Sequence, residues 1–182
     1  MRTLIRKRKV LGTIIPIVVL IVLLLVTVKP FPVIGDSMGP TLQWGQWLLT
    51  NKIAYHSHEP ERGDIIIFHP LYNPKVDIIK RLIALPDDTV EVRDGVVYVN
   101  DLPLDEPYIK EPPTYIFFRI IVPENEYFVL GDTRNDAFDS HTGWTLPRQN
   151  IVGKAWLSIW PPSQWGLVAH YSLQEQLVNP TQ

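Results

Sequence analysis

The sequence predicts a mainly β domain that follows one membrane-spanning helix at the N-terminus. The first observation is an uncharged run at 10–28, rich in Ile, Val and Leu, whose length suits a bilayer. The second is that the rest of the chain alternates short β-rich runs with turn residues. The third is composition, because 17 prolines and 6 tryptophans in 182 residues suit a loop-rich β protein better than a helical one.

The apolar run at 10–28 would be about 28 Å long as a helix. Basic residues crowd its N-terminal side, and only Lys29 follows closely; they are Arg2, Arg6, Lys7, Arg8 and Lys9. The positive-inside rule therefore predicts that 1–9 is cytoplasmic and that 29–182 lies across the membrane. A cleaved signal peptide is the alternative, but it usually has a shorter apolar region that ends in a small-x-small pattern. Here the sequence continues VTVKPFPVIG, so we expect an uncleaved anchor.

Beyond the anchor, turn residues separate a series of predicted strands. We expect single strands at 46–51, 64–68, 76–84, 126–130 and 151–160. A hairpin at 89–99 should turn at Asp94-Gly95, a pair that tolerates positive φ. We expect a proline-rich loop at 100–113, no strong signal in the tail after Pro162, and no helix longer than two turns outside the anchor. These elements predict one domain over 29–182.

Composition excludes several kinds of chemistry. The formal net charge of −2 gives no reason to expect nucleic acid as a partner. The absence of cysteine removes disulfides, thiolate catalysis and cysteine-based metal sites. His56-x-His58 lacks an evident third ligand, and Arg134 breaks an EF-hand pattern over 132–139. We therefore expect no metal and no cofactor.

Ser37 and Lys80 are the candidate reactive pair. Ser37 lies in GDSMGPTL (35–42), where glycine and proline interrupt both strand and helix and favour a fixed turn. In a strand over 76–84, Lys80 shares its face only with apolar residues, while Asp77 and Arg81 on the other face can pair with each other or meet solvent. Burial lowers the pKa of a lysine, which makes its neutral amine a general base for a serine hydroxyl. The alternative is a lysine that snorkels at a strand edge.

Four motifs in order behind one anchor resemble the type I signal peptidases. They are GDSMGPTL (35–42), RGDIIIF (62–68), KRLIALPDD (80–88) and GDTRNDAFDSH (131–141). The resemblance spans residues 1 to about 160. It implies a signal-peptidase-like (LexA-like) β fold and a serine endopeptidase with no metal and no cofactor. Its substrates would be preproteins cleaved after small-x-small sites at the end of their signal peptides.

The resemblance also assigns roles to residues. Ser37 would be the nucleophile, with its own backbone N–H meeting the oxyanion, and Lys80 would be the general base. Apolar residues near Ser37 would help to form shallow pockets for small substrate side chains, and two more before Lys80 would lie along the bound strand; with Gly35 before the nucleophile, this set is Ile34, Gly35, Met38, Leu42, Ile78 and Ile79. The matching motifs further imply a supporting set: Arg81, Gly131, Asp132, Arg134, Asp139 and Ser140.

This chain departs from the family pattern at several motif positions. The last motif usually reads GDN-x-x-x-S-x-D-S-R, and its first serine hydrogen-bonds the lysine amine; this chain has Ala137 there. Thr133 replaces Asn, and His141 replaces the Arg that pairs with Asp139. Ala84 and Asp87 replace two glycines of the lysine motif. The lost hydroxyl bears on how Lys80 is positioned.

Location favours a substrate held at the bilayer. Ser37 lies nine residues after Val28, so it reaches at most about 30 Å from the surface. Signal peptides present their cleavage sites near that interface, and Phe31, Trp44 and Trp47 could rest in the headgroup layer. We expect a single-pass protein of the cell (plasma) membrane with lipid and preproteins as partners. The alternatives are an anchored β module that binds exported chains without turnover, a related Ser-Lys peptidase with one dedicated substrate, and an organelle-membrane processing peptidase.

Overall fold

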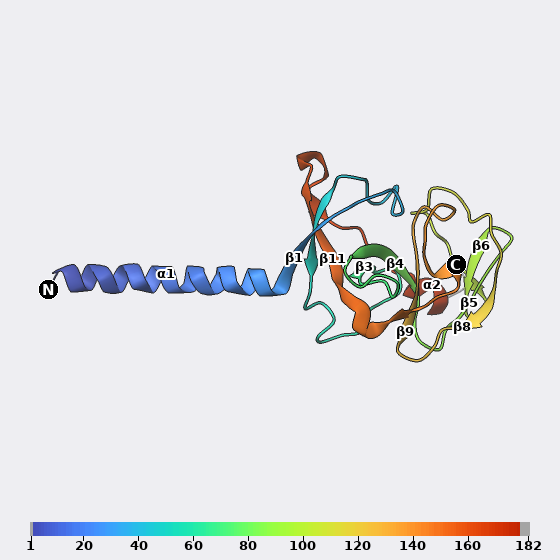
Figure 1. Ribbon diagram of the computed structural model, residues 1–182, viewed down its shortest axis with the longest axis horizontal. Helices are drawn as coiled ribbons and strands as arrows, with labels where there is room; N and C mark the ends of the chain where they lie inside the picture. The colour runs from blue at the N-terminus through green and yellow to red at the C-terminus, as the bar shows by residue number, and fades with distance from the viewer. Residues whose placement is uncertain (1, 179–182) are drawn as a thin grey trace.

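The computed structural model describes the backbone of residues 2–178 and the side chains of residues 14–177. A long helix projects from a β domain, and the strands form two sheets (Figure 1). The helices are α1 (Arg2–Thr27) and α2 (Gln174–Val178), with short 3₁₀ helices at Ser140–Thr142, Arg148–Asn150 and Pro162–Gln164. The strands are β1 (Val28–Pro32), β2 (Trp47–Asn51), β3 (Ile65–Phe68), β4 (Ile78–Ala84), β5 (Thr89–Arg93), β6 (Val96–Val99), β7 (Leu102–Pro103), β8 (Phe117–Ile121), β9 (Glu126–Leu130), β10 (Leu146–Pro147), β11 (Ile151–Trp160) and β12 (Gly166–Leu167).

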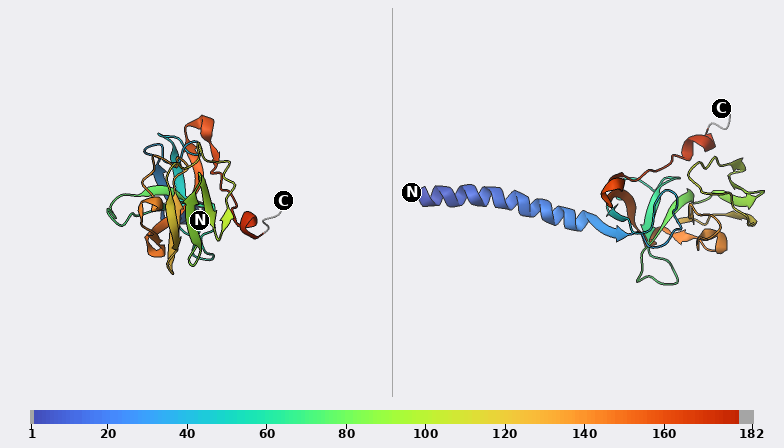
Figure 2. Two further views of the ribbon diagram at one scale, coloured as in Figure 1. Left: turned by 90° about the vertical axis from the view of Figure 1, so that its right-hand side faces the viewer. Right: turned by 90° about the horizontal axis from the view of Figure 1, so that it is seen from above.

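The helix predicted over 10–28 lies within α1 except for Val28, which begins β1. Figure 2 shows the helix running directly into that strand. Within the described part of the chain, no helix combines the length and apolar character needed to cross a membrane.

The larger sheet has eight strands in the order β1-β2-β11-β3-β4-β9-β10, with β12 added beside β11. The smaller sheet, β7-β6-β5-β8, lies at the end of the domain away from α1 (Figures 1 and 2). All recorded pairings are antiparallel. The mainly β prediction is therefore confirmed, as is the absence of a longer helix elsewhere in residues 28–178.

The predicted hairpin is confirmed at its turn. Asp94 and Gly95 have φ of 53° and 76°, the double positive φ that a two-residue connection requires. The strands β1, β7, β8, β10 and β12 were not predicted, and β8 shows the reason. Its inward residues Phe117 and Ile120 pack on the core, while Phe118 is 84% exposed, so β8 shows no regular apolar alternation.

The expectation that Arg81 meets Asp77 or solvent is wrong. Strand β4 lies in the middle of its sheet, and all its residues from Ile79 to Ala84 are buried. Both faces are covered, because one core cluster contains Ile83 and another contains Leu82. An arginine on either face is then inside the protein, and it needs a buried partner.

The tail beyond Pro162 packs on the domain although its sequence carries no strong signal. The His170 Nδ1 atom accepts a hydrogen bond from the Ile65 N–H at 3.1 Å, and Nε2 lies 2.9 Å from the Ala155 carbonyl oxygen. Leu173 is fully buried in the core cluster beneath the smaller sheet. A histidine that accepts from one backbone group and donates to another must be neutral.

We expect His170 to make stability depend on pH in a defined window. Burial and nearby Lys154 lower the pKa of His170 to about 4. Because the unfolded imidazole takes up its proton near pH 6.5, stability present above pH 6.5 is lost as pH falls toward 4, by on the order of 2 kcal/mol. Urea unfolding at pH 7, 5.5 and 4.5 should show a smaller loss for His170→Gln than for the parent. Exposed His56→Gln is the control, and an equal loss in the parent and His170→Gln would contradict the assignment.

Candidate active site

Ser37 lies in a tight loop between β1 and β2. Gly35 has φ of 86°, a conformation that favours glycine. The Gly39 N–H donates to the Asp36 carbonyl at 2.9 Å, and the Leu42 N–H donates to the Met38 carbonyl at 2.8 Å. These bonds give the loop the fixed shape that its glycines and proline predicted.

The segment after β9 holds this loop from the other side. The Thr133 N–H donates to the Ser37 carbonyl at 3.1 Å. The Thr133 hydroxyl donates to the Asp36 carbonyl at 2.6 Å and also lies 3.1 Å from the Gly39 carbonyl oxygen. A Cβ atom on Gly131 would lie 2.5 Å from the Ser37 carbonyl oxygen. Only glycine allows the two segments to approach this closely, and threonine at 133 still supplies a side-chain donor.

Lys80 reaches the nucleophile candidate from β4. Its Nζ lies 2.7 Å from Ser37 Oγ, and the lysine is only 5% exposed. Burial lowers the pKa of Lys80 from 10.5 to about 8, against the opposing influence of the Asp139 and Asp132 carboxylates. At that pKa an appreciable fraction of the amine is neutral near neutral pH. A neutral amine at hydrogen-bond distance can accept the hydroxyl proton.

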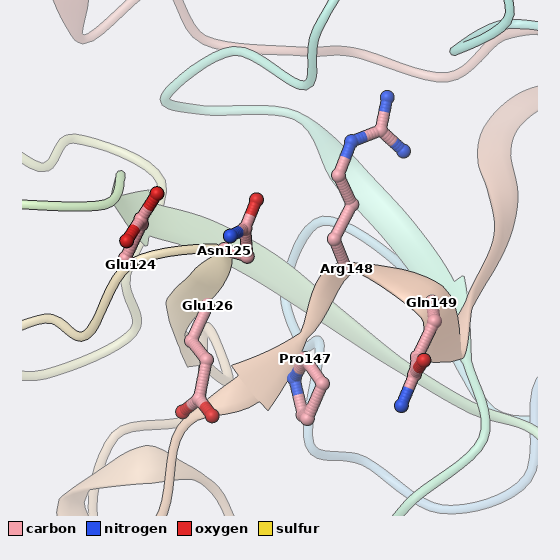
Figure 3. A pocket seen from close by; sticks show the side chains of 6 residues that line it. All are labelled: Glu124, Asn125, Glu126, Pro147, Arg148 and Gln149. Carbon is pink, nitrogen blue, oxygen red and sulfur yellow. The ribbon is translucent and has the colours of Figure 1, made fainter.

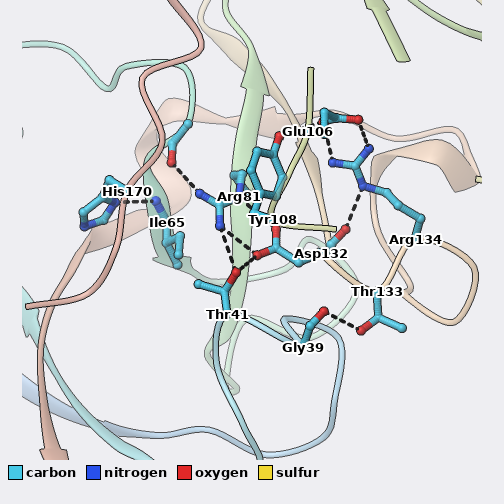
Figure 4. A network of polar contacts seen from close by, with 12 residues as sticks. Gly39, Thr41, Ile65, Arg81, Glu106, Tyr108, Asp132, Thr133, Arg134 and His170 are labelled. Atoms are coloured by element: carbon cyan, nitrogen blue, oxygen red, sulfur yellow. Dashed lines mark hydrogen bonds and ion pairs between the residues drawn. The ribbon is translucent and has the colours of Figure 1, made fainter. Parts of the chain in front are cut away.

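Arg81, the next residue, forms a fully buried ion pair with Asp132 (Figure 4). Arg81 Nε and Nη2 donate to the two carboxylate oxygens at 2.8 and 2.7 Å, and the Thr41 hydroxyl donates to the same group at 2.5 Å. Arg81 also donates to the Gly63 carbonyl at 3.0 Å. This network joins β4, the end of β9 and the loop after Ser37, so it fixes Lys80 relative to Ser37.

A second buried pair lies beside the first. Arg134 donates to both carboxylate oxygens of Glu106 at 2.5 and 2.6 Å and to the Gly131 carbonyl at 3.0 Å. The Tyr108 hydroxyl donates to Glu106 at 2.6 Å, and its ring lies 4.0 Å from the Arg81 guanidinium carbon (Figure 4). The sequence did not predict a role for Glu106 and Tyr108, because they lie in the proline-rich segment 100–113, where no local pattern marks an inward carboxylate.

Asp139 and Ser140 bind the end of β9. The Asp139 carboxylate accepts from the Gly131 N–H at 2.8 Å, and the Ser140 hydroxyl accepts from the Val129 N–H at 3.0 Å. His141 Nδ1 lies 2.6 Å from the other Asp139 oxygen. The histidine that replaces the usual arginine therefore keeps the contact with the aspartate.

Ala137 lies beside Gly131 and brings no hydroxyl to the site. Within the described part of the chain, Ser37 Oγ is the one hydrogen-bond partner recorded for the Lys80 amine. The contact between Lys80 and Ser37 is present without the family's orienting serine. In residues 14–177 no group of three or more His, Asp or Glu side chains is placed to hold a metal ion.

The apolar residues expected around the substrate differ in how far they are buried. Met38, Leu42 and Ile79 are buried in one core cluster under the Ser37 loop, whereas Ile34 is 77% exposed. Ile78, half-buried, packs against a different cluster. The Ser37 cavity, with a volume of about 580 Å³, is lined by Asp36, Ser37, Gly39, Pro40, Leu42, Gln43, Lys110, Thr133 and Asp136.

A second cavity of about 520 Å³ lies away from this pair. Glu124, Asn125, Glu126, Pro147, Arg148 and Gln149 line it (Figure 3). It lies at the start of β9, whereas Ser37 contacts the residues just after β9 ends. It therefore belongs to the other end of that strand.

The known proteins that this chain resembles are signal peptidases and a processing peptidase. Residues 6–160 match the family described as signal peptidase, peptidase S26. A probable signal peptidase I-1 from Synechocystis sp. is 44% identical over 151 residues, which are 79% of this chain and 77% of that protein. Signal peptidase I U from Bacillus subtilis is 33% identical over 87% of this chain and 92% of its own. Thylakoidal processing peptidase 1 from Arabidopsis thaliana is 40% identical over 75% of this chain and 43% of its own.

The family match covers most of the chain, and the relatives align over most of its length. The four motifs that carry the sequence resemblance all lie within residues 6–160. The chain therefore belongs to the signal peptidase family, peptidase S26, and is a serine-type endopeptidase.

Proposed function

We propose that the protein is a membrane-anchored peptidase that removes signal peptides from preproteins, with Ser37 as nucleophile and Lys80 as general base. The observation that carries this is the 2.7 Å contact between Ser37 Oγ and Lys80 Nζ, inside surroundings that lower the pKa of the lysine to about 8. An isolated buried lysine would be costly, and such a perturbation is typical of functional sites.

The chemistry follows from this pair. The neutral Lys80 amine takes the Ser37 hydroxyl proton as Oγ attacks the substrate carbonyl carbon. The oxyanion that develops is met by the Ser37 backbone N–H. The resulting ammonium then gives its proton to the leaving amine, which leaves an acyl group on Ser37. Lys80 next deprotonates a water molecule, which hydrolyses that ester and restores the site.

The substrate would bind as an extended chain beside the backbone that precedes Ser37 and the backbone that precedes Lys80. Ile34 precedes the nucleophile and is exposed, and Ile78 and Ile79 precede the base. Met38, Leu42 and Ile79 already fill the space beneath the loop. These buried apolar side chains would form the floor of the substrate pockets, which favours small substrate residues one and three positions before the cleaved bond.

Membrane attachment is the second part of the proposal. The apolar side chains of α1 from Ile14 to Val26 are about half exposed or more, as a lipid-facing helix requires. Trp47 and Trp160 are also exposed, and they pair with each other at the Pro32 end of β1, four residues after α1 enters that strand at Val28. Aromatic residues favour the headgroup layer. The basic start of the chain places it in the cytoplasm and residues 29–182 across the plasma membrane.

The test uses the full chain in detergent with a preprotein whose signal ends in Ala-x-Ala. We expect cleavage after the second Ala, found by mass, and a loss of about 10³-fold or more in kcat for Ser37→Ala and for Lys80→Ala. Exposed Ser57→Ala and Lys75→Ala are matched controls and should retain full activity. Cleavage that persists undiminished in Ser37→Ala would exclude this nucleophile.

Other outcomes separate the alternatives. An intact substrate that binds to a cooperatively folded parent would favour a binding module over a peptidase, and the departures at Ala137 and His141 are the features that favour this alternative. Cleavage of one native partner, with no cleavage of general preproteins, would indicate a dedicated processing peptidase. Fractionation of the source cells decides between the plasma membrane and an organelle membrane, a distinction raised by the thylakoidal relative.

A further inference from the structure

The start of β1 and the residue before β4 are joined by an ion pair that the proposed chemistry does not use. Lys29 Nζ lies 2.5 Å from Asp77 Oδ2, and His69 Nδ1 lies 3.0 Å from Asp77 Oδ1. The Lys29 side chain is 42% exposed. An ion pair this exposed contributes little to stability. Its location between β1 and the start of β4 points to a role other than stability.

The Lys29–Asp77 pair connects two strand edges that have no neighbouring strand among the described residues. One of them is the outer edge of β1. Among residues 2–178, strand β1 is the outermost strand of its sheet and pairs only with β2. The Lys52 N–H donates to the Thr27 carbonyl, and the Val33 N–H donates to the Gln46 carbonyl. Odd-numbered residues of β1 therefore direct their backbone groups toward β2, and even-numbered ones face outward.

Pro30 and Pro32 thus occupy outward-facing positions. Proline has no N–H, so this part of the edge cannot donate to an added strand. Ile34 is the first position after the prolines that offers an outward N–H. Pairing with a substrate is therefore favourable near Ser37 and weak toward Lys29.

The second free edge belongs to β4. The Leu82 N–H donates to the Asp64 carbonyl of the β3 side, so even-numbered residues of β4 face β3. The backbone groups of Asp77 and Ile79 face the opposite edge. Strand β9 covers that edge only from Arg81 onward. Among the described residues no strand lies beside the outward backbone groups of Asp77 and Ile79, so a bound chain can pair with them.

Two side-chain contacts therefore join the same two segments. One segment is β1 with the Ser37 loop, the other is the start of β4, and the space between them is here called the slot. Ser37–Lys80 lies at one end and Lys29–Asp77 at the other, and only Ile78 and Ile79 separate Asp77 from Lys80. At about 3.3 Å per residue the slot between the two contacts is about 10 Å long on the β4 side. A chain extended along β4 from Ser37 meets the ion pair after about three residues.

We infer that the Lys29–Asp77 ion pair is the upstream limit of the substrate slot and fixes how many residues lie extended before the cleaved bond. This inference rests on the proposed function. The bound chain leaves the slot at the ion pair, so the apolar part of a signal peptide begins beyond it. Lys29 and Asp77 are positioning residues that set the accepted spacing between apolar segment and cleavage site.

A spacer series tests the inference. Preproteins are made in which the number of polar residues between the apolar segment and Ala-x-Ala increases one at a time. For the parent we expect a sharp optimum, with kcat/KM falling about tenfold when the spacer is two residues longer. Lys29→Ala opens the slot, so a spacer two residues longer should lower kcat/KM by about threefold or less. The kcat at the optimum spacer should be nearly unchanged. The exchange Lys29→Asp with Asp77→Lys should restore the sharp optimum.

Lys52→Ala is the matched control. Its Nζ donates to the Val26 carbonyl at 3.0 Å, so it also lies at the end of α1 but does not reach β4. An optimum in Lys29→Ala as sharp as that of the parent would overturn the inference. An equal loss on every spacer would overturn it too, because that result indicates general damage. A parent that cleaves no substrate would instead overturn the proposed function.

Discussion

Replacing Lys80 with methionine should abolish cleavage and, at the same time, make the protein more stable at pH 7. Methionine has nearly the same length and fills the same buried space, but it carries no amine. Loss of the general base should lower kcat by about 10³-fold or more. A pKa lowered from 10.5 to about 8 means that the fold disfavours the charged amine, at a cost of roughly 3 kcal/mol at pH 7.

Lys80→Met should also remove a pH dependence of the folding stability, whose sign follows from the lowered pKa of Lys80. Between pH 8 and 10.5 the unfolded lysine keeps a proton that the folded lysine has lost, so the parent gains stability as pH rises through this window. Below pH 8 both states are protonated and the full cost is present. Denaturant unfolding at pH 7, 8.5 and 10 should show this rise in the parent and not in Lys80→Met.

Ser37→Ala is the control for this experiment. It removes the nucleophile and leaves the buried amine, so it should be inactive and still show the rise in stability above pH 8. A Lys80→Met protein no more stable than the parent at pH 7, with the rise above pH 8 intact, would contradict the burial of a perturbed lysine.

Removal of the Asp132 carboxylate should have the largest effect on stability. Asp132→Ala leaves Arg81 fully buried without its counter-charge and also removes the acceptor for the Thr41 hydroxyl. Breaking one side of a buried ion pair typically costs about 3–5 kcal/mol. Urea unfolding should show a large fall in the midpoint, and residual folded protein should cleave slowly because the network no longer fixes Lys80.

The exposed pair between Asp101 and Arg119 offers a comparison within the same chain. Both side chains are about half exposed or more, so Asp101→Ala should leave the unfolding midpoint nearly unchanged. Replacing both buried partners, as Arg81→Met with Asp132→Leu, should recover part of the lost stability because no charge is left unpaired. A double variant as unstable as Asp132→Ala would show that packing, not the lone charge, accounts for the loss.

Much of the fold follows from local sequence. Asp94-Gly95 marks its hairpin because few residues accept two positive φ angles in succession. The predicted strands at 46–51, 64–68 and 151–160 correspond to β2, β3 and β11 to within a residue at each end. By contrast, β8 shows no regular alternation, and the tail contributes His170 and Leu173 through contacts with residues far along the chain.

The sequence by itself determined that Ser37 sits in a rigid turn and that Lys80 lies on a strand with apolar neighbours, because turns and strand faces are local properties. Only the tertiary structure decided which charges meet. Arg81 pairs with Asp132 and not with Asp77, and Asp77 instead meets Lys29. The physical reason is that a central strand is buried on both faces, so each charged group on it takes the partner that the sheet order brings near, at a sequence separation no local pattern records.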